Sequence, residues 1–227
     1  MGRRSIKVEV IGRERHLLVT IDDFVSDPVA LRKAAKETAF QPAYNHYPGI
    51  RASVPDGYEA ETSPILRNVF ASVFGRYGQN KLLDISFSMV TTRPSELSTP
   101  QTLPHCDALG ADRFALLHYL SEGDLGGTAF YRHRATSFEA IDEERAPSYF
   151  KAVDAELAAD YGRSPQYIQG ANDNYEVMRL AEPVFNRALV YPSFLLHSGI
   201  IETDNPLSSD PAAGRLTVTG FFSVGAR

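Results

Sequence analysis

The spacing of hydrophobic residues changes along the chain, and each change predicts a different element of secondary structure. In residues 6–11 and 16–21 the apolar positions alternate or cluster around Gly12-Arg13, which predicts a β-hairpin. Asp27-Pro28 has the residue types typical of a helix start, with the aspartate as N-cap and the proline in the first turn. A second helix is predicted to start at Ser63-Pro64, because apolar residues follow it at intervals of one, three and four.

From residue 82 onward the apolar period becomes two, which is typical of β-strands. Residues 138–165 interrupt this pattern and are predicted to be a helical insertion. Strands are predicted in residues 82–90, 114–120, 128–131, 175–180, 188–191, 197–201 and 216–224. The expected fold class is α+β and mainly β, with the early helices packed on the outer face of a sheet and a barrel later in the chain.

The chain shows no repeat, low-complexity segment or linker, so one domain over residues 1–227 is expected. Within it, residues 1–81 would supply N-terminal strands and supporting helices, and residues 82–227 the β-rich part. Residues 41–62 hold prolines, glycines and tyrosines, and are predicted to be irregular. The tyrosine-rich part, residues 44–51, is interpreted either as a lid or as a surface loop.

Composition narrows the classes of partner. The net charge of −5 argues against a broad nucleic-acid interface, which needs a basic face. Cys106 is the single cysteine, so no internal disulfide forms and a reducing compartment is expected. The sequence has neither a signal-peptide pattern nor an apolar run long enough for a membrane span, so a cytoplasmic location is expected. The oligomeric state does not follow from the sequence.

Two histidines and one aspartate are candidate metal ligands. His105 and Asp107 would point the same way from a strand, and Cys106 between them would point away as a small packed residue. His197 follows an apolar run, where a lone histidine is more often a hydrogen-bonded core residue. Taken together, two imidazoles and one carboxylate form the facial set that holds Fe(II) in non-haem oxygenases. Arg215 could then bind the far carboxylate of a dicarboxylic acid.

Six short motifs occur in the order expected for one known superfamily: Pro104-His105-Cys106-Asp107, Leu116–Ser121, Gly126-Gly127-Thr128-Ala129-Phe130, Leu189-Val190-Tyr191-Pro192, His197 and Arg215-Leu216-Thr217. Residues 82–227 thereby resemble the Fe(II)/2-oxoglutarate-dependent dioxygenases, in particular the prolyl-hydroxylase-like branch. The layout of the whole chain is also similar to that of an uncharacterised bacterial family of this type.

The resemblance implies a double-stranded β-helix, the jelly-roll core shared with cupins. It further implies that Fe(II) is held by His105, Asp107 and His197, and that 2-oxoglutarate is bound by Arg215 and Thr217, with Tyr119 as a further contact. The implied reaction couples oxidative decarboxylation of 2-oxoglutarate by molecular oxygen to hydroxylation of a small molecule or a protein side chain. The carboxylate ligand favours hydroxylation over halogenation.

Two departures and two alternatives accompany this resemblance. Ser121 stands where the branch has asparagine, and residues 202–214 form a polar loop that lengthens the spacing between His197 and Arg215. The chain could instead be a non-catalytic β-barrel binding module, or a cupin-like metal hydrolase or isomerase, since zinc uses similar ligands.

Residues 132–134, with the sequence Arg-His-Arg, could meet an anionic substrate or form a solvated strand end.

Overall fold

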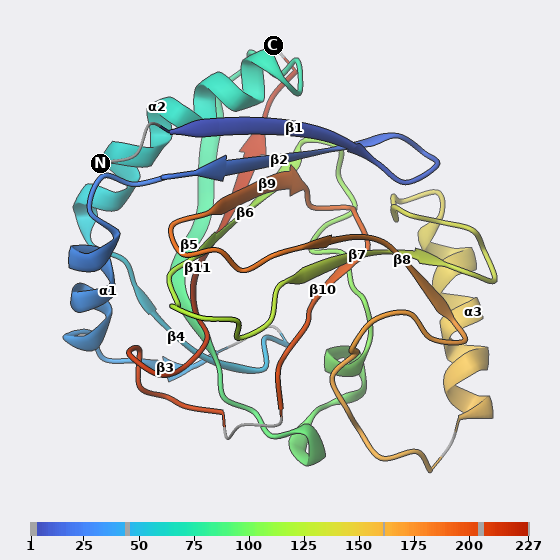
Figure 1. The fold of residues 1–227 in the computed structure, drawn as a ribbon. Helices are drawn as coiled ribbons and strands as arrows, with labels where there is room; N and C mark the ends of the chain where they lie inside the picture. Colours follow the sequence, from blue (N-terminus) through green and yellow to red (C-terminus); the bar gives the residue numbers. More distant parts are fainter. Residues whose placement is uncertain (1–3, 44–45, 161, 204–206, 227) are drawn as a thin grey trace.

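Two antiparallel β-sheets pack against each other in the computed structural model of the chain, which describes residues 4–43, 46–160, 162–203 and 207–226. The larger sheet has eight strands in the order β1-β2-β9-β6-β11-β5-β4-β3, and the smaller has three in the order β10-β7-β8. Figure 1 shows the smaller sheet beside the middle of the larger one.

The strands of the larger sheet are β1 (Ser5–Ile11), β2 (His16–Asp22), β3 (Gln41–Pro42), β4 (Gly49–Ser53), β5 (Asn80–Val90), β6 (Arg113–Tyr119), β9 (Ala188–Pro192) and β11 (Leu216–Val224). Those of the smaller sheet are β7 (Thr128–His133), β8 (Tyr175–Ala181) and β10 (His197–Gly199). The α-helices are α1 (Pro28–Lys36), α2 (Asp56–Ser72) and α3 (Ala146–Ala159), and two short 3-10 turns cover Pro94–Glu96 and Thr99–Thr102. No helix in the described ranges is both long and apolar enough to cross a membrane.

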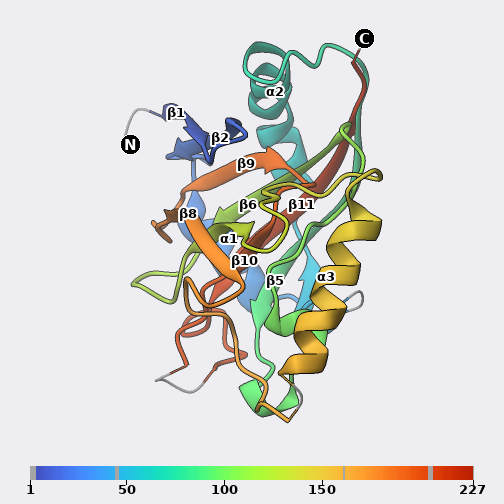
Figure 2. The ribbon, with the colours of Figure 1, turned by 90° about the vertical axis from the view of Figure 1, so that its right-hand side faces the viewer.

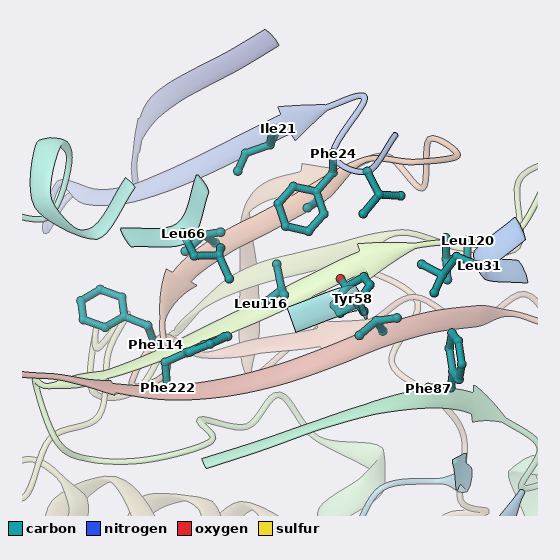
Figure 3. Close-up of a cluster of buried hydrophobic side chains, with 14 of the residues drawn as sticks. Ile21, Phe24, Leu31, Tyr58, Leu66, Phe87, Phe114, Leu116, Leu120 and Phe222 are labelled. Atoms are coloured by element: carbon teal, nitrogen blue, oxygen red, sulfur yellow. The ribbon is translucent and has the colours of Figure 1, made fainter. Parts of the chain in front are cut away.

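Helices α1 and α2 cover one face of the larger sheet. The main hydrophobic core lies between these helices and that face (Figure 3). Alternation along the strands builds this core: Leu216, Val218 and Phe222 of β11 point into it, as do Phe87 and Met89 of β5. The intervening residues of both strands point to the opposite face. The mainly β architecture with early helices on a sheet face is therefore found as expected.

The start of α2 differs from the prediction. The helix begins at Asp56, and Pro64 lies inside it. Its first turn buries Tyr58 and Thr62 on the same side as Leu66, which extends the apolar stripe toward the N-terminus. Residues 41–62 are consequently less irregular than expected, since they also contain β3 and β4. The predicted start was wrong because Ser63-Pro64, which lies inside the helix, has the residue types typical of a helix start.

The other predicted elements are present, with small shifts at their ends. The hairpin, the helix at Pro28, the insertion that forms α3 and the C-terminal strands all lie at the expected positions. Asp27 caps α1 by accepting a hydrogen bond from the Ala30 N–H (2.9 Å). Helix α3 covers the outer face of the smaller sheet (Figure 2), against Tyr131 and Tyr175. The predicted loop 202–214 lies where expected, although residues 204–206 are outside the described residues.

A second core fills the space between the two sheets. It joins Tyr119 and Tyr191 of the larger sheet to Phe130 of the smaller one. The buried polar side chain of His197 packs against Phe130 and Tyr191 in this space.

Candidate metal and anion site

His105 and His197 lie directly opposite each other in an isolated antiparallel bridge. The N–H of each donates to the carbonyl of the other at 2.9 Å, and the ring centroids are 4.6 Å apart. His197 is also paired with Phe130 in β10 and β7, so both imidazoles face the space between the sheets. The predicted strand around His105 is reduced to this single bridge, because the chain bends immediately after it.

Asp107 reaches the histidines because of that bend. Its backbone N–H donates to the Ser193 carbonyl (2.8 Å), which ties the turn to the end of β9. One carboxylate oxygen lies 3.6 Å from His105 Nε2, and the other lies 3.5 Å from His197 Nε2. The bend and the bridge together produce the convergence that the sequence spacing predicts.

The three side chains are spaced as a metal site requires. One ligand atom from each lies within 4.8 Å of the other two. Donors about 2.0–2.2 Å from one metal and at right angles around it would be separated by about 3 Å. The observed separations of 3.5 and 3.6 Å therefore need only a small inward adjustment. The His105 side chain is 52% exposed, against 7% for His197, so the cluster has an accessible side where further ligands can enter.

The surroundings of each histidine favour a form that can bind metal. His197 Nδ1 donates to the Leu195 carbonyl (2.9 Å), which leaves Nε2 with its lone pair toward Asp107. Desolvation, with a smaller effect from nearby His197, lowers the pKa of His105 to about 4, although Asp107 acts in the opposite direction. His105 can therefore present a neutral nitrogen to a metal at neutral pH, and His197 directs its Nε2 toward the same point.

Arg215 is a buried cation without a carboxylate partner among the described residues. Its side chain donates from Nε to the Gly126 carbonyl (2.9 Å) and from Nη2 to the Gly127 carbonyl (3.2 Å). The residue is only 8% exposed, and no carboxylate of the described residues forms an ion pair with it. A buried charge without a partner is costly, so this arrangement fits a site that receives an anion.

A close backbone approach fixes the turn that holds this arginine. A Cβ atom at Gly126 would lie 1.8 Å from the Ile200 carbonyl oxygen, and the residue has a φ of +89°. Only glycine can occupy that position without moving the chain. The Gly-Gly pair therefore sets the orientation of the Arg215 guanidinium.

Thr217 and Tyr119 both lie near Arg215, but their hydroxyl groups have different surroundings. The Thr217 hydroxyl donates to the Ser88 carbonyl over 3.3 Å, close to the limit for a hydrogen bond. Tyr119 lies below the guanidinium, with 5.8 Å from Arg215 Cζ to the ring centroid. Its hydroxyl already donates to Thr128 Oγ1 at 2.7 Å.

The Arg-His-Arg segment is not a free basic patch, which corrects one interpretation. Arg132 is 7% exposed and pairs with Glu139 (3.0 Å) and Glu176. His133 is fully buried beside Glu156, with 3.0 Å between Nε2 and the carboxylate. Glu156 belongs to α3 and Glu139 to the segment before it, so these contacts hold that region to the smaller sheet.

A second cluster of possible ligands, Glu14, His16 and Glu139, has a structural role. Glu139 is fully buried and accepts from the N–H groups of Arg13 (2.8 Å) and Glu14 (2.9 Å). In this cluster, Arg132 pairs with Glu139 and Arg145 pairs with Glu14. This cluster anchors the β1–β2 turn.

Cys106 is a packed residue, as the sequence suggests. It lies in the core under α3, and burial together with nearby Asp107 raises the pKa of its thiol to about 11. The thiol is therefore protonated and apolar in character at neutral pH.

Comparisons with known proteins agree with the fold. The family described as "Family of unknown function (DUF6445)" matches residues 3–222. A search of curated proteins by sequence gave no match. The non-haem α-ketoglutarate-dependent epimerase SnoN from nogalamycin biosynthesis is similar in structure, with a TM-score of 0.50 and 11% identity over 92% of this chain and 78% of that one. Apo HygX from Streptomyces hygroscopicus has a TM-score of 0.50 and 9% identity over 95% and 87% of the two chains. The chain thus shares its fold with these two proteins, of which the first is described as α-ketoglutarate-dependent.

Proposed function

The chain belongs to the family of unknown function DUF6445, and for it we propose an Fe(II)- and 2-oxoglutarate-dependent oxygenase that hydroxylates a small molecule or a protein side chain. In this proposal the two sheets are the double-stranded β-helix of the superfamily. Figure 1 shows β10 and β7, which hold His197 and its neighbours, beside β6 and β11 of the larger sheet.

One observation carries the proposal: a metal-type cluster lies near a buried arginine that no carboxylate of the described residues neutralises, and the arginine lies beside Gly199, two residues after His197. His105, Asp107 and His197 supply the first, and Arg215 supplies the second. A metal hydrolase requires the cluster but has no need of a buried cation for a second carboxylate. A 2-oxo dicarboxylic acid would use both, because its 2-oxo acid end can chelate the metal and its second carboxylate can pair with the arginine.

The three ligand residues fit Fe(II) in type and geometry. Neutral imidazoles and a carboxylate suit this ion, and three protein ligands leave positions for a chelating acid and oxygen. When bound, the iron would supply activation of oxygen coupled to decarboxylation of 2-oxoglutarate. The name of SnoN supports this chemistry, since that protein is described as α-ketoglutarate-dependent.

The remaining residues would bind 2-oxoglutarate or hold other groups of the site in position. Arg215 would pair with the distal carboxylate through the N–H groups that its two backbone contacts leave available. Thr217 would turn its hydroxyl from the long contact with Ser88 toward the same carboxylate. Tyr119 would support the guanidinium face, since its own hydroxyl is engaged with Thr128. Leu195 would hold His197 in the tautomer that binds metal.

The reaction itself provides the test. Purified protein with Fe(II), 2-oxoglutarate and oxygen should form succinate and carbon dioxide in equal amounts, slowly in the absence of the prime substrate. Omission of Fe(II) or oxygen should stop succinate formation. Iron binding with no succinate and no 2-oxoglutarate binding would reject the oxygenase and favour the binding module or the metal hydrolase.

A further inference from the structure

Tyr47 has a buried hydroxyl group with no hydrogen-bond partner among the described residues. Its ring packs in a small apolar cluster with Leu97, Tyr167 and Ile201, contributed by segments far apart in the sequence. An unsatisfied buried hydroxyl is unfavourable and uncommon in folded proteins. The orphaned group therefore suggests a partner that is not part of the protein.

The hydroxyl lies beside the proposed anion site. Burial raises the pKa of the Tyr47 phenol, whereas the nearby charge of Arg215 and the nearby side chains of Thr217 and Ser88 lower it. These two side chains lie close to the phenol, but neither has the geometry of a hydrogen bond to it. At neutral pH the phenol is protonated and can donate. Tyr119, the tyrosine predicted for this role, has already donated to Thr128.

Local structure fixes Tyr47 in this place. Gly49 pairs with Val90 at the end of β5, and a Cβ atom there would lie 1.9 Å from the Met89 carbonyl oxygen. This close approach brings the preceding turn against the strand that carries Ser88. The Arg51 guanidinium lies over the Tyr47 ring, with 4.7 Å from Cζ to the centroid, and Asp84 pairs with Arg51 at 3.2 Å.

We propose that Tyr47 donates a hydrogen bond to the distal carboxylate of the bound dicarboxylic acid, opposite Arg215. The proposal rests on the proposed function and extends it. It assigns the end of the co-substrate site to Tyr47, which lies just before β4, and makes that residue a determinant of specificity. A 2-oxo acid that lacks the second carboxylate would gain nothing from Tyr47.

Calorimetric titration of 2-oxoglutarate into the anaerobic Fe(II) protein tests this role through Tyr47→Phe. A lost hydrogen bond to a charged group predicts an affinity decrease of roughly tenfold or more, with Fe(II) affinity unchanged. The matched control is Tyr131→Phe, which also removes a buried hydroxyl without a hydrogen-bond partner among the described residues but lies in the core under α3, and it should leave 2-oxoglutarate affinity unchanged. Affinity for 2-oxovalerate, which has no distal carboxylate, should be the same in the parent and in Tyr47→Phe.

A stability measurement separates binding from structure. Without ligand, Tyr47→Phe should be at least as stable to heat as the parent, because only an orphaned hydroxyl is removed. Unchanged 2-oxoglutarate affinity in Tyr47→Phe would overturn the role of Tyr47 alone. A parent protein that binds Fe(II) but no 2-oxoglutarate would overturn the proposed function as well.

A separate observation concerns β1, which is the end strand of the larger sheet (Figure 2). No strand of the described residues pairs with its outer edge. Ile6, Val8 and Val10 form a row on one face, with exposed fractions of 46%, 46% and 51%. A long apolar edge strand is a pairing site that monomeric proteins usually protect.

The sequence of β1 is complementary to itself. In antiparallel pairing around a two-fold axis at Val8, Lys7 would face Glu9 of a second copy, and Ile6 would face its Val10. Both Lys7–Glu9 pairs would be attractive, and the apolar rows of the two copies would join. Lys7 contacts Glu9 on its own strand at 3.0 Å but is 66% exposed, so its side chain can reorient. We infer that β1 pairs with β1 of a second copy to form a two-fold dimer with one continuous sheet.

Sedimentation velocity tests the dimer. The parent should sediment as a dimer, and Val8→Lys, which places two lysines at the axis, as a monomer. Val29→Lys is the control, because Val29 is 66% exposed on α1, away from the strand edge. Lys7→Glu should weaken the dimer, and Lys7→Glu combined with Glu9→Lys should restore it. A monomeric parent, or a dimer that Val8→Lys leaves intact, would overturn the inference.

Discussion

The two faces of the larger sheet differ in a way that separates folding from function. On the helix-covered face, residues such as Leu66, Phe87 and Val218 are almost fully buried among apolar neighbours. On the opposite face the same strands carry Ser88 and Thr217, near the buried charge of Arg215. On the first face the buried polar group His118 has hydrogen-bond partners, whereas on the second face the buried Tyr47 hydroxyl has none among the described residues.

Stability alone does not explain the second face. Apolar residues of similar size would remove the cost of burying Arg215 and the Tyr47 hydroxyl. The presence of Arg215 and Tyr47 near a metal-type cluster is therefore expected of a binding site. Mutations on the two faces should accordingly give opposite patterns: loss of binding with a stable fold on one face, and loss of stability with intact binding on the other.

The largest effect is expected at the metal cluster. Asp107→Ala removes the carboxylate that lies between the two histidines, and succinate formation should fall to background, as it should for His105→Ala. The fold should persist, because these groups lie outside the main core. Glu144→Ala, an exposed acid before α3, should retain parental turnover. Parental turnover in His105→Ala would rule out this metal site.

Arg215→Ala should weaken 2-oxoglutarate binding and leave Fe(II) binding largely unchanged. Removing one member of a buried, hydrogen-bonded charge pair costs about 2–5 kcal/mol. This corresponds to a loss of roughly 30-fold to several-thousand-fold in affinity. Arg215→Lys should be intermediate, because lysine keeps the charge but loses the two-pronged geometry. Calorimetry on the anaerobic iron complex measures both ligands, and unchanged 2-oxoglutarate affinity in the alanine variant would exclude Arg215 from the site.

Leu66→Ala tests the helix-covered face. Leu66 is 2% exposed in the main core, so the substitution should lower the free energy of unfolding by about 2–5 kcal/mol. Denaturant unfolding measures this loss. The folded variant should bind 2-oxoglutarate with parental affinity. A selective loss of that affinity would show that the two faces are coupled.

A smaller effect is expected from His118, a core histidine between Tyr58 (3.1 Å) and Asn186 (3.1 Å). Burial lowers its pKa to about 3, below the value of about 6.5 in the unfolded chain. The unfolded state therefore takes up a proton as the pH falls below about 6.5 while the folded state does not. This contribution destabilises the fold between about pH 6.5 and 3, by at most about 1.4 kcal/mol per pH unit.

His118→Gln should remove that part of the pH dependence. Unfolding free energies of the parent and the variant, measured between pH 7 and pH 4, should differ in slope with the parent steeper. Equal slopes would show that His118 is protonated in the folded protein over this range.

Much of the fold was predictable because it depends on local patterns. The alternation in β11 and the aspartate cap of α1 each act within a few residues, and both were predicted. The start of α2 was not, since Pro64 inside the helix has the appearance of a start signal. Its true start depends on Tyr58 and Thr62 packing beneath the sheet, which is a tertiary effect.

The candidate site divides in the same way. His105, Asp107, His197 and Arg215 could be selected from motif order. The structure brings the first three together and places Arg215 beside Gly199, two residues after His197. Tyr47 could not, because its relation to Arg215 depends on the pairing of β4 with β5. Likewise the Arg132 segment looked free only because its acidic partners, Glu139 and Glu176, come from other parts of the chain.

The central claim is that one site between the sheets binds a metal and a 2-oxo dicarboxylic acid together. Anaerobic addition of Fe(II) and 2-oxoglutarate to the purified protein tests it most directly by visible absorption. The account predicts a weak charge-transfer band that requires both components and is absent from Asp107→Ala. Iron binding without any such band in the parent protein would contradict the account.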